Sequence, residues 1–466
     1  MKKNTDVLII GFGKAGKTLA GKLAAHGRKV IIVEEDATRY GGTCINVACL
    51  PTKFLVNSAE DLSNAKELGL KLTQEETANH YKKIVQDKKV LIGKLRNANY
   101  NMLAKLDTVE VITGKATFKS NELVEIKTAD DTHEVTADHI IINTGSSAVI
   151  PEVKGLELGD RIYDNVTYMD EERFIPRLAI LGAGYIGLEF SDMALKFGSQ
   201  VTLIHNSNRF LTREDADDRD ALKAHLEQNG ANLLLNTKLL EVKHNENSLT
   251  LALQDSEGKL FDIEVDGLLV ATGRRANTAG LGLENTTLEV NKDGSIQVDE
   301  NLKTNVKNIW AAGDVKGGLQ FTYISLDDSR IILPQLSGKI SSHGLNSRGA
   351  VPYTVFLAPP YSRVGLNETE AERIGIPYQV YNMPVSEIPK AKITKATEGH
   401  WKILLSESGT VLGATLFGAE SQELINILTF AVNDEWHYTK LSDQIYNHPT
   451  MVEGFNMIFT PQWKVK

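Results

Sequence analysis

Two stretches of the chain repeat one pattern of hydrophobic and polar positions. In the first stretch, residues 6–10 form a short apolar run, a glycine-rich turn follows, and residues 17–26 have a helical period. A second apolar run covers residues 29–33 and ends at Glu34. This order predicts a buried strand, a tight turn, a helix and a second parallel strand, which together form a βαβ unit.

The same pattern returns far along the chain. Residues 178–181 are apolar, a glycine-rich turn follows, a helical pattern extends to about residue 197, and residues 200–204 form an apolar run that ends at His205. Glu34 lies 23 positions after Gly11, and His205 lies 23 positions after Gly182. Two units with the same internal spacing are far more specific than a single glycine motif.

The remaining segments predict other kinds of structure. Residues 58–106 are polar with a helical period, and short strands follow through residue 142. From about residue 351 the short segments 351–357, 378–382 and 401–405 are rich in aromatic and β-branched residues, and a helix follows near 420–433. We therefore expect an α/β protein with two Rossmann-like dinucleotide-binding domains and a separate C-terminal domain with an antiparallel sheet.

Composition narrows the class of protein. A chain of 466 residues with 42% hydrophobic residues can bury several cores, at about 150 residues per domain. A net charge of -9, with basic residues spread along the chain, argues against a nucleic-acid or anionic membrane partner. The first apolar run is too short for a signal peptide, and no run approaches the ~18 apolar residues of a transmembrane helix. We expect a cytoplasmic protein.

The first glycine turn is predicted to bind an adenine dinucleotide. Gly11 allows the tight turn, Gly13 lets the backbone approach a pyrophosphate, and Gly16 permits close packing of helix and strand. The backbone N–H groups at the helix start then face the phosphates. Glu34 can accept hydrogen bonds from ribose hydroxyls.

The second turn differs at the position that discriminates between nucleotides. Gly182, Gly184 and Gly187 repeat the motif, but His205 stands where an acidic residue would bind the ribose 2′-OH of NAD and repel a 2′-phosphate. His205 or Arg209 could contact that phosphate, or both could be solvated surface residues. NADH and NADPH both stay open, with a slight preference for NADPH.

The chain has two cysteines, Cys44 and Cys49. On a regular helix they would lie roughly 7.5 Å apart along the axis, whereas a disulfide needs Cα atoms within about 7 Å, so the backbone near residues 47–48 must be distorted if a bridge forms. Closing so short a loop would stabilise the fold by only ~2 kcal/mol. A reactive dithiol, with a thiolate favoured at a helix N-terminus, explains the pair better than a structural bridge or a chance pair of buried side chains.

Residues 41–53, GGTCINVACLPTK, resemble the active-site motif of the class I pyridine nucleotide-disulfide oxidoreductases, which include dihydrolipoamide dehydrogenase, glutathione reductase and mercuric reductase. The resemblance implies that Cys44 is the outer, interchange thiol and Cys49 the thiol nearest the flavin. It also implies that Lys53 lies near flavin N5 with Glu189 as its carboxylate partner.

The resemblance covers nearly the whole chain. Tyr185 matches the aromatic lid over the nicotinamide pocket, and His448 with Glu453 matches a general acid-base dyad that reaches the active site of a partner subunit. One departure is Ala48, where glycine is usual. Besides the residues named above, the implied cofactor contacts are Gly42, Thr43, Thr144, Gly145, Gly313 and Asp314 for FAD, and Gly273 for NAD(P)H.

The family resemblance also implies a domain order typical of glutathione-reductase-like proteins. Residues 1–150 would bind FAD, 151–272 would bind NAD(P)H, 273–349 would complete the FAD site, and 350–466 would form a dimerisation domain. We expect a homodimer with shared active sites.

Three segments, 11–20, 317–328 and 358–365, resemble the reactive-chlorine-resistance flavoproteins, which are associated with hypochlorous-acid defence and Cu(II) reduction. We therefore expect FAD-dependent oxidation of NADPH or NADH, with Cu(II) or a related metal ion reduced at Cys44 and Cys49 and bound there only transiently. One alternative is a reductase of a low-molecular-weight disulfide, of the glutathione or dihydrolipoamide type. Another is a redox-sensing flavoprotein without turnover, which the intact His448–Glu453 pair argues against.

Overall fold

The computed structural model describes residues 1–465, and its N-terminal part is a seven-stranded sheet. The strands run in the order β3-β2-β1-β6-β5-β4, with β17 paired to β6. β1, β2, β3, β6 and β17 are parallel, whereas β5 runs antiparallel to both of its neighbours, β4 and β6. Their bounds are β1 (Lys2–Ile10), β2 (Val30–Glu34), β3 (Val109–Thr113), β4 (Lys115–Phe118), β5 (Leu123–Lys127), β6 (Thr132–Ile142) and β17 (Ile309–Ala311).

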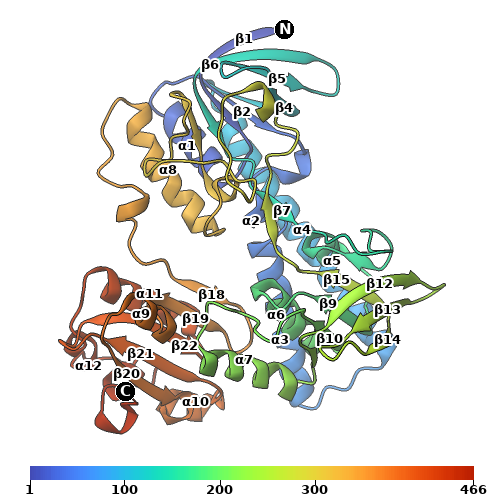
Figure 1. The fold of residues 1–466 in the computed structure, drawn as a ribbon, viewed down its shortest axis with the longest axis vertical. Coiled ribbons are helices and arrows are strands. Elements are labelled where there is room, and N and C mark those ends of the chain that lie inside the picture. Colours follow the sequence, from blue (N-terminus) through green and yellow to red (C-terminus); the bar gives the residue numbers. More distant parts are fainter. Residues whose placement is uncertain (466) are drawn as a thin grey trace.

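Both faces of this sheet are covered, because successive side chains of a strand point to opposite faces. Val7 and Ile9 of β1 belong to a core with α1 (Lys14–Ala24) and α8 (Thr322–Leu336), which lie side by side on one face (Figure 1). Leu8 and Ile10 belong to the core on the other face. This explains the unbroken apolar run that the sequence has here.

A second parallel sheet has the strand order β11-β10-β9-β15-β8. An antiparallel sheet, β12-β13-β14, lies beside it, and the two-stranded pair β7-β16 lies where the chain crosses between the two halves. The strands are β7 (Ser146–Ala148), β8 (Ile162–Tyr163), β9 (Arg177–Leu181), β10 (Gln200–Ile204), β11 (Asn232–Leu234), β12 (Lys238–His244), β13 (Leu249–Gln254), β14 (Leu260–Val265), β15 (Gly267–Val270) and β16 (Arg274–Ala276). The helices are α5 (Asn165–Asp170), α6 (Tyr185–Phe197) and α7 (Ala216–Gln228).

Both predicted βαβ units are confirmed, with one shift at a helix start. The first helix was expected over residues 17–26 but covers Lys14–Ala24. It begins directly after Gly13, whose carbonyl accepts the first intrahelical hydrogen bond from Lys17 N at 3.0 Å. The glycine turn therefore leads into the helix without an intervening loop.

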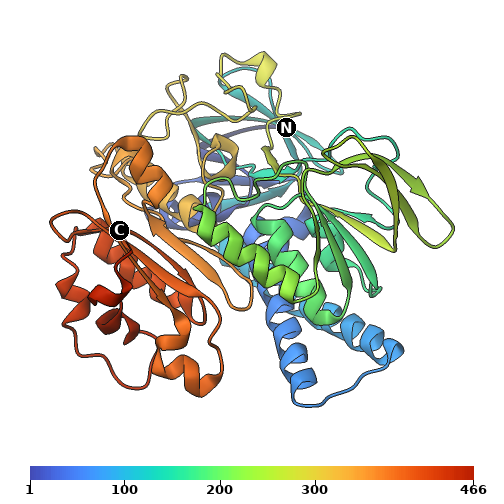
Figure 2. The same cartoon turned by 60° about the horizontal axis from the view of Figure 1, so that its bottom comes forward.

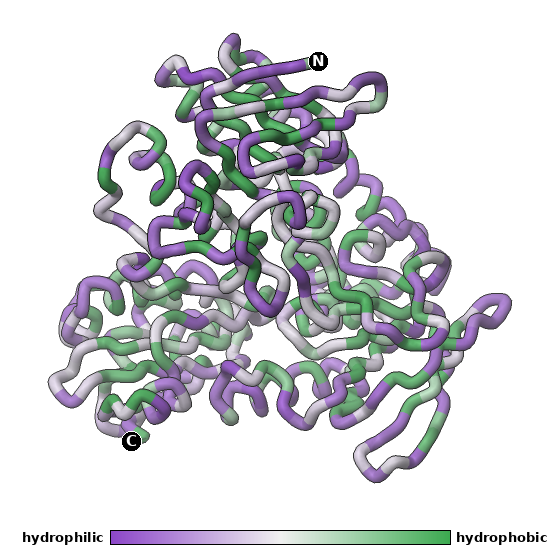
Figure 3. The backbone as a smooth tube through the Cα atoms, turned by 45° about the horizontal axis from the view of Figure 1, so that its top comes forward, coloured by the Kyte–Doolittle hydropathy of each residue, from purple (hydrophilic) through white to green (hydrophobic). Residues whose placement is uncertain are grey.

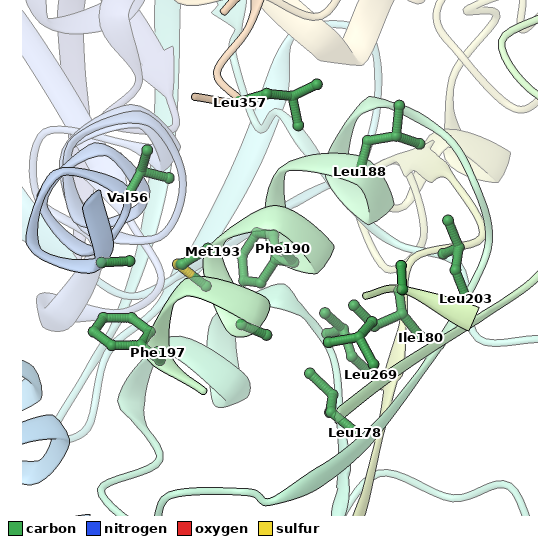
Figure 4. Packing of buried hydrophobic residues seen from close by; sticks show 14 of the residues in the cluster. Val56, Leu178, Ile180, Leu188, Phe190, Met193, Phe197, Leu203, Leu269 and Leu357 are labelled. Carbon is green, nitrogen blue, oxygen red and sulfur yellow. The ribbon is translucent and has the colours of Figure 1, made fainter. Parts of the chain in front are cut away.

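Three helices connect the halves: α2 (Thr43–Asn46), α3 (Cys49–Glu67) and α4 (Gln74–Ala104). The hairpin of α3 and α4 extends from the body of the molecule (Figure 2). The inner side of α3 joins a large apolar core in which Val56 meets Phe190, Met193 and Phe197 of α6 (Figure 4). Because α3 carries Cys49 at its first residue, this core fixes the cysteine segment to the second dinucleotide unit.

The C-terminal part is an antiparallel sheet in the order β18-β19-β22-β21-β20, as the sequence predicted. Its strands are β18 (Tyr353–Val355), β19 (Tyr361–Gly365), β20 (Gln379–Pro384), β21 (His400–Leu405) and β22 (Val411–Phe417). Its helices are α9 (Glu368–Ile374), α10 (Pro389–Thr394), α11 (Ser421–Asn433), α12 (Thr439–Ser442) and α13 (Gly454–Met457). The strand expected over 351–357 is shorter, because the Phe356 amide bonds to the Glu189 carboxylate instead of a neighbouring strand.

Hydrophobic segments gather in the strands and hydrophilic segments at the turns (Figure 3). The fold class expected from the sequence, an α/β protein with two Rossmann-like domains and an α+β C-terminal domain, is confirmed. No helix within residues 1–465 combines the length and the apolar character needed to cross a membrane.

Candidate active site

The first glycine turn is held by Asn143, the residue after β6. The φ of Gly11 is +104°, and a Cβ there would lie 2.3 Å from the Asn143 carbonyl oxygen, so only glycine fits. Asn143 Oδ1 accepts a hydrogen bond from Gly16 N at 2.9 Å, and Asn143 Nδ2 donates to the Ala312 carbonyl at 2.6 Å. Asn143 thus joins the turn to the segment that carries Gly313 and Asp314.

The carboxylate of Glu34 closes this turn from the end of β2. It accepts hydrogen bonds from Phe12 N at 3.0 Å and Asp36 N at 3.3 Å, and within residues 1–465 it forms no ion pair. Burial raises its pKa. A half-buried carboxylate without a cationic partner, at the end of the second strand, fits the ribose hydroxyls of an adenine dinucleotide.

The other residues predicted to contact FAD lie around the same turn. A Cβ on Gly42 would lie 2.6 Å from Gly13 Cα, so the loop before Cys44 closes tightly against the turn. Thr43 is the first residue of α2, and Thr144 donates to the Asn277 carbonyl at 2.7 Å. Gly145 and Gly313 both have positive φ. Asp314 accepts a hydrogen bond from Ser146 Oγ at 2.7 Å.

The second glycine turn has the same backbone but a more open middle. Gly182 has a φ of +109°, and a Cβ on Gly187 would lie 2.0 Å from the Gly182 carbonyl oxygen. Nothing lies within 4 Å of a Cβ built on Gly184, or on Gly273 across the turn. The helix that starts at Tyr185 therefore presents its N-terminus to an open space, as a dinucleotide site requires.

The two residues expected to select the nucleotide differ in environment. His205 is half-buried, and burial lowers its pKa, so its ring is neutral at pH 7. Arg209 is exposed, and its backbone amide bonds to Ser207 Oγ at 3.2 Å. Of the two, Arg209 is the residue with a permanent positive charge for a 2′-phosphate.

The cysteine segment is a broken helix, as the spacing predicted for a pair that can bridge. α2 ends at Asn46 and α3 begins at Cys49; between them Val47 and Ala48 adopt φ values of -144° and -143°. Cys44 is the second residue of α2, so each thiol lies in the first turn of a helix, where the dipole favours a thiolate. Both cysteines are free thiols, and each is partly buried.

The two thiols share a proton unequally. A hydrogen bond from Cys49 lowers the pKa of Cys44 to about 6, with smaller contributions from Thr322, Lys17 and Lys14. The same hydrogen bond, together with burial, raises the pKa of Cys49. Cys49 Sγ also lies 3.7 Å from Thr322 Oγ1 at the start of α8. Cys44 is therefore the more acidic, nucleophilic thiol of the reduced pair.

One turn after Cys49, Lys53 forms an ion pair with Glu189 of α6 at 2.8 Å. Lys53 Nζ also lies 3.9 Å from the centre of the Phe356 ring, and Glu189 accepts from Phe356 N at 2.8 Å. The predicted pair is thus brought together at the boundary between the two dinucleotide units. An ammonium so fixed can orient a hydrogen bond toward a ring nitrogen of a bound flavin.

His448 and Glu453 form the predicted dyad, with Nδ1 and Oε2 2.8 Å apart. The His448 side chain is 69% exposed and the Glu453 side chain 12% exposed. The dyad lies after α12 in the C-terminal domain, which is far from α2 in the chain shown in Figure 1. The structure of one subunit therefore brings the dyad together but does not bring it to the cysteines.

Several residues of the site were missed from the sequence. Lys17, which the sequence analysis gave no role, is 6% exposed, and its Nζ donates to the Gly41 carbonyl at 3.2 Å and to Asn99 Oδ1 at 2.6 Å. Thr322 lies in the segment 317–328, which was used only for its resemblance to a group of flavoproteins, and no residue of that segment was assigned a chemical role. Glu214 lies in an acidic run that is typical of a solvated surface, yet it is fully buried.

Comparison with known proteins gives a consistent result. The family profile "Pyridine nucleotide-disulphide oxidoreductase" matches residues 5–329, and the profile of its dimerisation domain matches residues 351–458. The chain is 38% identical over 456 residues to the probable pyridine nucleotide-disulfide oxidoreductase RclA of Escherichia coli (strain K12), covering 98% of each protein. It is 30% identical over 461 residues to a mercuric reductase of Lysinibacillus sphaericus, covering 97% of this chain and 82% of that protein.

Solved structures agree. The Cu(II) complex of the HOCl-induced flavoprotein disulfide reductase RclA from Escherichia coli is similar with a TM-score of 0.90 and 38% identity, covering 98% of this chain and 99% of that chain. A Cu(II) complex of a cysteine-to-serine variant of the same protein is similar to the same extent, with a TM-score of 0.90.

Proposed function

The chain belongs to the pyridine nucleotide-disulphide oxidoreductase family and is a flavoprotein enzyme, and from that premise we propose that it passes electrons from NAD(P)H to Cu(II) through Cys44 and Cys49. The observation that carries the proposal is the pair of free thiols at two helix N-termini, with the pKa of Cys44 lowered to about 6. Soft thiolates suit Cu(I) as the product. Likeness to an HOCl-induced protein solved with Cu(II) supports a place in defence against oxidants.

The proposed FAD contacts are the first glycine turn, Glu34, the loop at Gly42 and Thr43, and the segments at Thr144 and Asp314. The residues at these positions fit the group: glycines permit close approach, and Glu34 is a half-buried acceptor without an ion-pair partner in the described chain. FAD, when bound, would carry two electrons from the nicotinamide to the cysteine pair. The second turn, from Gly182 to Gly187, would hold NAD(P)H.

The thiols carry the step at the acceptor. Oxidation of Cys44 and Cys49 to a disulfide releases two electrons and the protons that the thiols still hold, and it reduces two Cu(II) ions to Cu(I). One NAD(P)H then returns the pair to the dithiol, so that one nicotinamide is oxidised for every two copper ions. Cys44, the more acidic thiol, meets the metal, and Cys49 lies on the flavin side, beside Thr322 and one turn before Lys53.

Copper is proposed as a transient substrate. Within residues 1–465, the groups of three or more potential metal ligands are Asp217 with Asp218 and His400, and Asp215 with Asp217 and Glu368. The Lys402 ammonium lies 2.9 Å from Asp215 and 2.7 Å from Asp217, so a cationic side chain already binds carboxylates of both clusters. Two thiols hold a metal ion less firmly than the three or four ligands of a resident site.

The test is Cys44→Ser, read as Cu(I) formation with a Cu(I)-specific chelator. Copper binding alone would not test the role of Cys44, because a cysteine-to-serine variant of the relative was itself solved as a Cu(II) complex. We expect NAD(P)H-dependent Cu(I) formation to fall at least about 100-fold, while anaerobic reduction of bound flavin by NAD(P)H continues. If Cys44→Ser leaves Cu(I) formation untouched, the thiol route is wrong.

A second candidate function is reduction of a low-molecular-weight disulfide, which the hydrogen-bonded His448–Glu453 dyad favours. An imidazole oriented by a carboxylate is the general acid-base that thiol–disulfide interchange needs. Rapid NAD(P)H oxidation with glutathione disulfide or lipoamide, and none with Cu(II), would select this function.

We also propose a homodimer in which His448 of a second copy serves the cysteines. The test is coexpression of Cys44→Ser and His448→Ala subunits. A mixed dimer then keeps one complete site, with Cys44 from one subunit and His448 from the other. The NAD(P)H-dependent reductase activity per mixed dimer should therefore recover toward half that of the wild type. Recovery would be absent if each subunit used its own histidine. The four-domain division at residues 150, 272 and 349 and a cytoplasmic location are part of the same proposal.

A further inference from the structure

The backbone between the two cysteines has a carbonyl group that the following helix cannot satisfy. In an α-helix the N–H of each residue bonds to the carbonyl four positions earlier, so the donor for the Val47 carbonyl would be the N–H of residue 51. Residue 51 is proline, which has no N–H. The Val47 carbonyl accepts instead from Asn165 Nδ2, at 3.0 Å. A side chain 118 positions away therefore holds the break between α2 and α3.

Asn165 is itself held firmly in place. It is buried, and it is the first residue of α5, which packs against α3 and α4 (Figure 1). The preceding residue, Asp164, caps α5: its carboxylate accepts from Val166 N at 3.0 Å and from Thr167 N at 2.8 Å. Because these bonds stabilise the start of the helix, the amide of Asn165 is a fixed donor rather than a mobile surface group.

A second contact from α5 reaches the same segment three residues after Cys49. Thr52 Oγ1 donates to Met169 Sδ at 3.3 Å, and both side chains are buried. This contact lies beyond both thiols, whereas the hydrogen bond from Asn165 lies between them. The two contacts both connect α5 to the cysteine segment, and only the one from Asn165 acts on the interval between the thiols.

The hydrogen bond from Asn165 has a different effect in each redox state. In a disulfide, a covalent bond fixes the interval between Cys44 and Cys49. In the dithiol form, which the structure shows, that covalent bond is absent, and Asn165 holds the carbonyl in the middle of the interval. Without Asn165 the dithiol segment gains conformational freedom that a bridged segment cannot gain. Loss of this hydrogen bond therefore stabilises the dithiol relative to the disulfide.

We propose that Asn165 is a positioning residue for the cysteine pair: by holding the Val47 carbonyl it keeps the two thiols at the separation from which they close to a disulfide, and it thereby lowers the reduction potential of the pair. The proposal rests on the part of the proposed function in which Cys44 and Cys49 cycle between dithiol and disulfide, and not on copper as the acceptor. Two groups held in position react as if at a higher concentration than two mobile groups. Because α5 belongs to the half of the chain proposed to bind NAD(P)H, that half helps to set the reducing power of the thiols.

The first measurement is the midpoint potential of the Cys44–Cys49 pair in the FAD-loaded protein. The protein is equilibrated without oxygen in buffers of reduced and oxidised dithiothreitol, and free thiols are trapped by alkylation and counted by mass spectrometry. As the Sγ–Sγ bond forms, two electrons and the protons that the thiols still hold pass to oxidised dithiothreitol. Its S–S bond opens to two thiols, and water supplies any proton that a thiolate lacks.

We expect Asn165→Ala to lower the equilibrium constant for disulfide formation about 3- to 10-fold, the effect of one hydrogen bond. A tenfold fall corresponds to a rise of ~30 mV in the reduction potential. Asn165→Leu keeps the branched shape of asparagine and removes its donor, so it should give a rise of the same size, and it decides the question if Asn165→Ala does not fold. The matched control is Thr52→Val, which removes the other bond to α5 and should leave the potential unchanged.

The acidity of Cys44 gives a second measurement that a purely structural bond would not change. A hydrogen bond from Cys49 lowers the pKa of Cys44 to about 6, and this bond requires the two thiols to stay close together. In the reduced protein, Asn165→Ala should therefore move the pH midpoint of Cys44 alkylation upward, because the thiolate loses a donor. Thr52→Val should keep the wild-type midpoint.

An unchanged or lower potential in the Asn165 variants would overturn the proposal. An equal rise in Thr52→Val would also overturn it, because any loosening of α5 would then act on the thiols. Failure of the proposed function has a different signature: a wild-type protein that never forms the Cys44–Cys49 disulfide in these buffers has no such redox cycle. Failure to reduce Cu(II) leaves this test intact.

Discussion

The two glycine turns have nearly the same backbone and different surroundings. Gly11 and Gly182 have φ values of +104° and +109°, and a Cβ on either would lie 2.3 or 2.4 Å from a carbonyl oxygen of the strand-end crossing, that of Asn143 or Ala271. The difference begins at the middle glycine. A Cβ on Gly13 would lie 2.6 Å from Asn143 Oδ1, whereas one on Gly184 would meet nothing within 4 Å.

The comparison separates two uses of one motif. The first turn is enclosed by the loop at Gly42, by Asn143 and by the carboxylate of Glu34, as suits a group that stays bound. The second turn is open at Gly184 and ends in His205 rather than an acid, as suits a nucleotide that binds and leaves. Identical spacing in sequence therefore does not imply identical occupancy.

The largest effect should come from breaking the enclosed turn. Gly11→Ala forces an L side chain into positive φ and against a backbone oxygen, so we expect a loss of about 3 kcal/mol or more in unfolding free energy and release of flavin. Gly184→Ala, with φ of -82° and open space around it, should cost about 0.5 kcal/mol or less and keep flavin. Thermal unfolding and flavin absorbance after gel filtration measure both.

The second variant of this pair should instead weaken nucleotide binding. Gly184→Ala adds a methyl group where the nucleotide backbone would approach, so the Kd of NADP⁺ should rise although the fold is intact. Equal flavin retention in the two variants would show that the turns are alike and would break the comparison.

A smaller effect is expected at the strand ends. His205→Glu restores the acid that Glu34 supplies in the first unit, so a negative charge would repel a 2′-phosphate and accept from a 2′-OH. We expect the ratio of kcat/KM for NADPH to that for NADH to fall about tenfold. The control is Arg209→Gln, which should weaken NADPH alone, since burial keeps His205 neutral. A wild-type enzyme that strongly prefers NADH would contradict the preference for NADPH.

The repeated unit was predictable because its determinants are local. Strand runs, glycines and the closing residues lie within about 28 positions of one another, and every glycine of the two motifs except Gly184 is required by a positive φ or a close approach. The break between α2 and α3 was also predictable, because the disulfide distance and the helical rise cannot both be satisfied by residues five apart.

What the sequence could not predict depends on contacts between distant segments. Glu214 lies in the run TREDADD, where charge alone predicts a solvated surface, but Tyr353, Tyr361 and Arg363 come from 139 or more positions away and bury it. His448 is the opposite case. Its motif was evident, yet within one chain its domain lies far from α2, which carries Cys44 (Figure 1).

The smallest effect concerns the residue after the third glycine, which is Lys17 in the first unit and Leu188, fully buried, in the second. The Lys17 ammonium lies among Gly41 and Asn99, and its charge helps to lower the pKa of Cys44 to about 6. An acid with a lowered pKa is ionised above that value, so at pH 7 the Cys44 thiolate should exceed the thiol about tenfold. The first unit thus contacts the thiol segment as well as forming a proposed dinucleotide site, and the second unit has no such lysine at this position.

Removing that charge should shift the titration upward. In the reduced protein, the rate of Cys44 alkylation, followed by mass spectrometry of its peptide, should rise through about pH 6 and level off near neutrality. Lys17→Met should raise this apparent pKa by about half to one unit, because a nearby cation favours the charged form of the thiol. Lys17→Arg keeps the charge and should keep the wild-type profile. An unchanged profile for Lys17→Met would assign the acidity of Cys44 to its hydrogen bond with Cys49 and to the helix start alone, and the two units would then differ only in their enclosure.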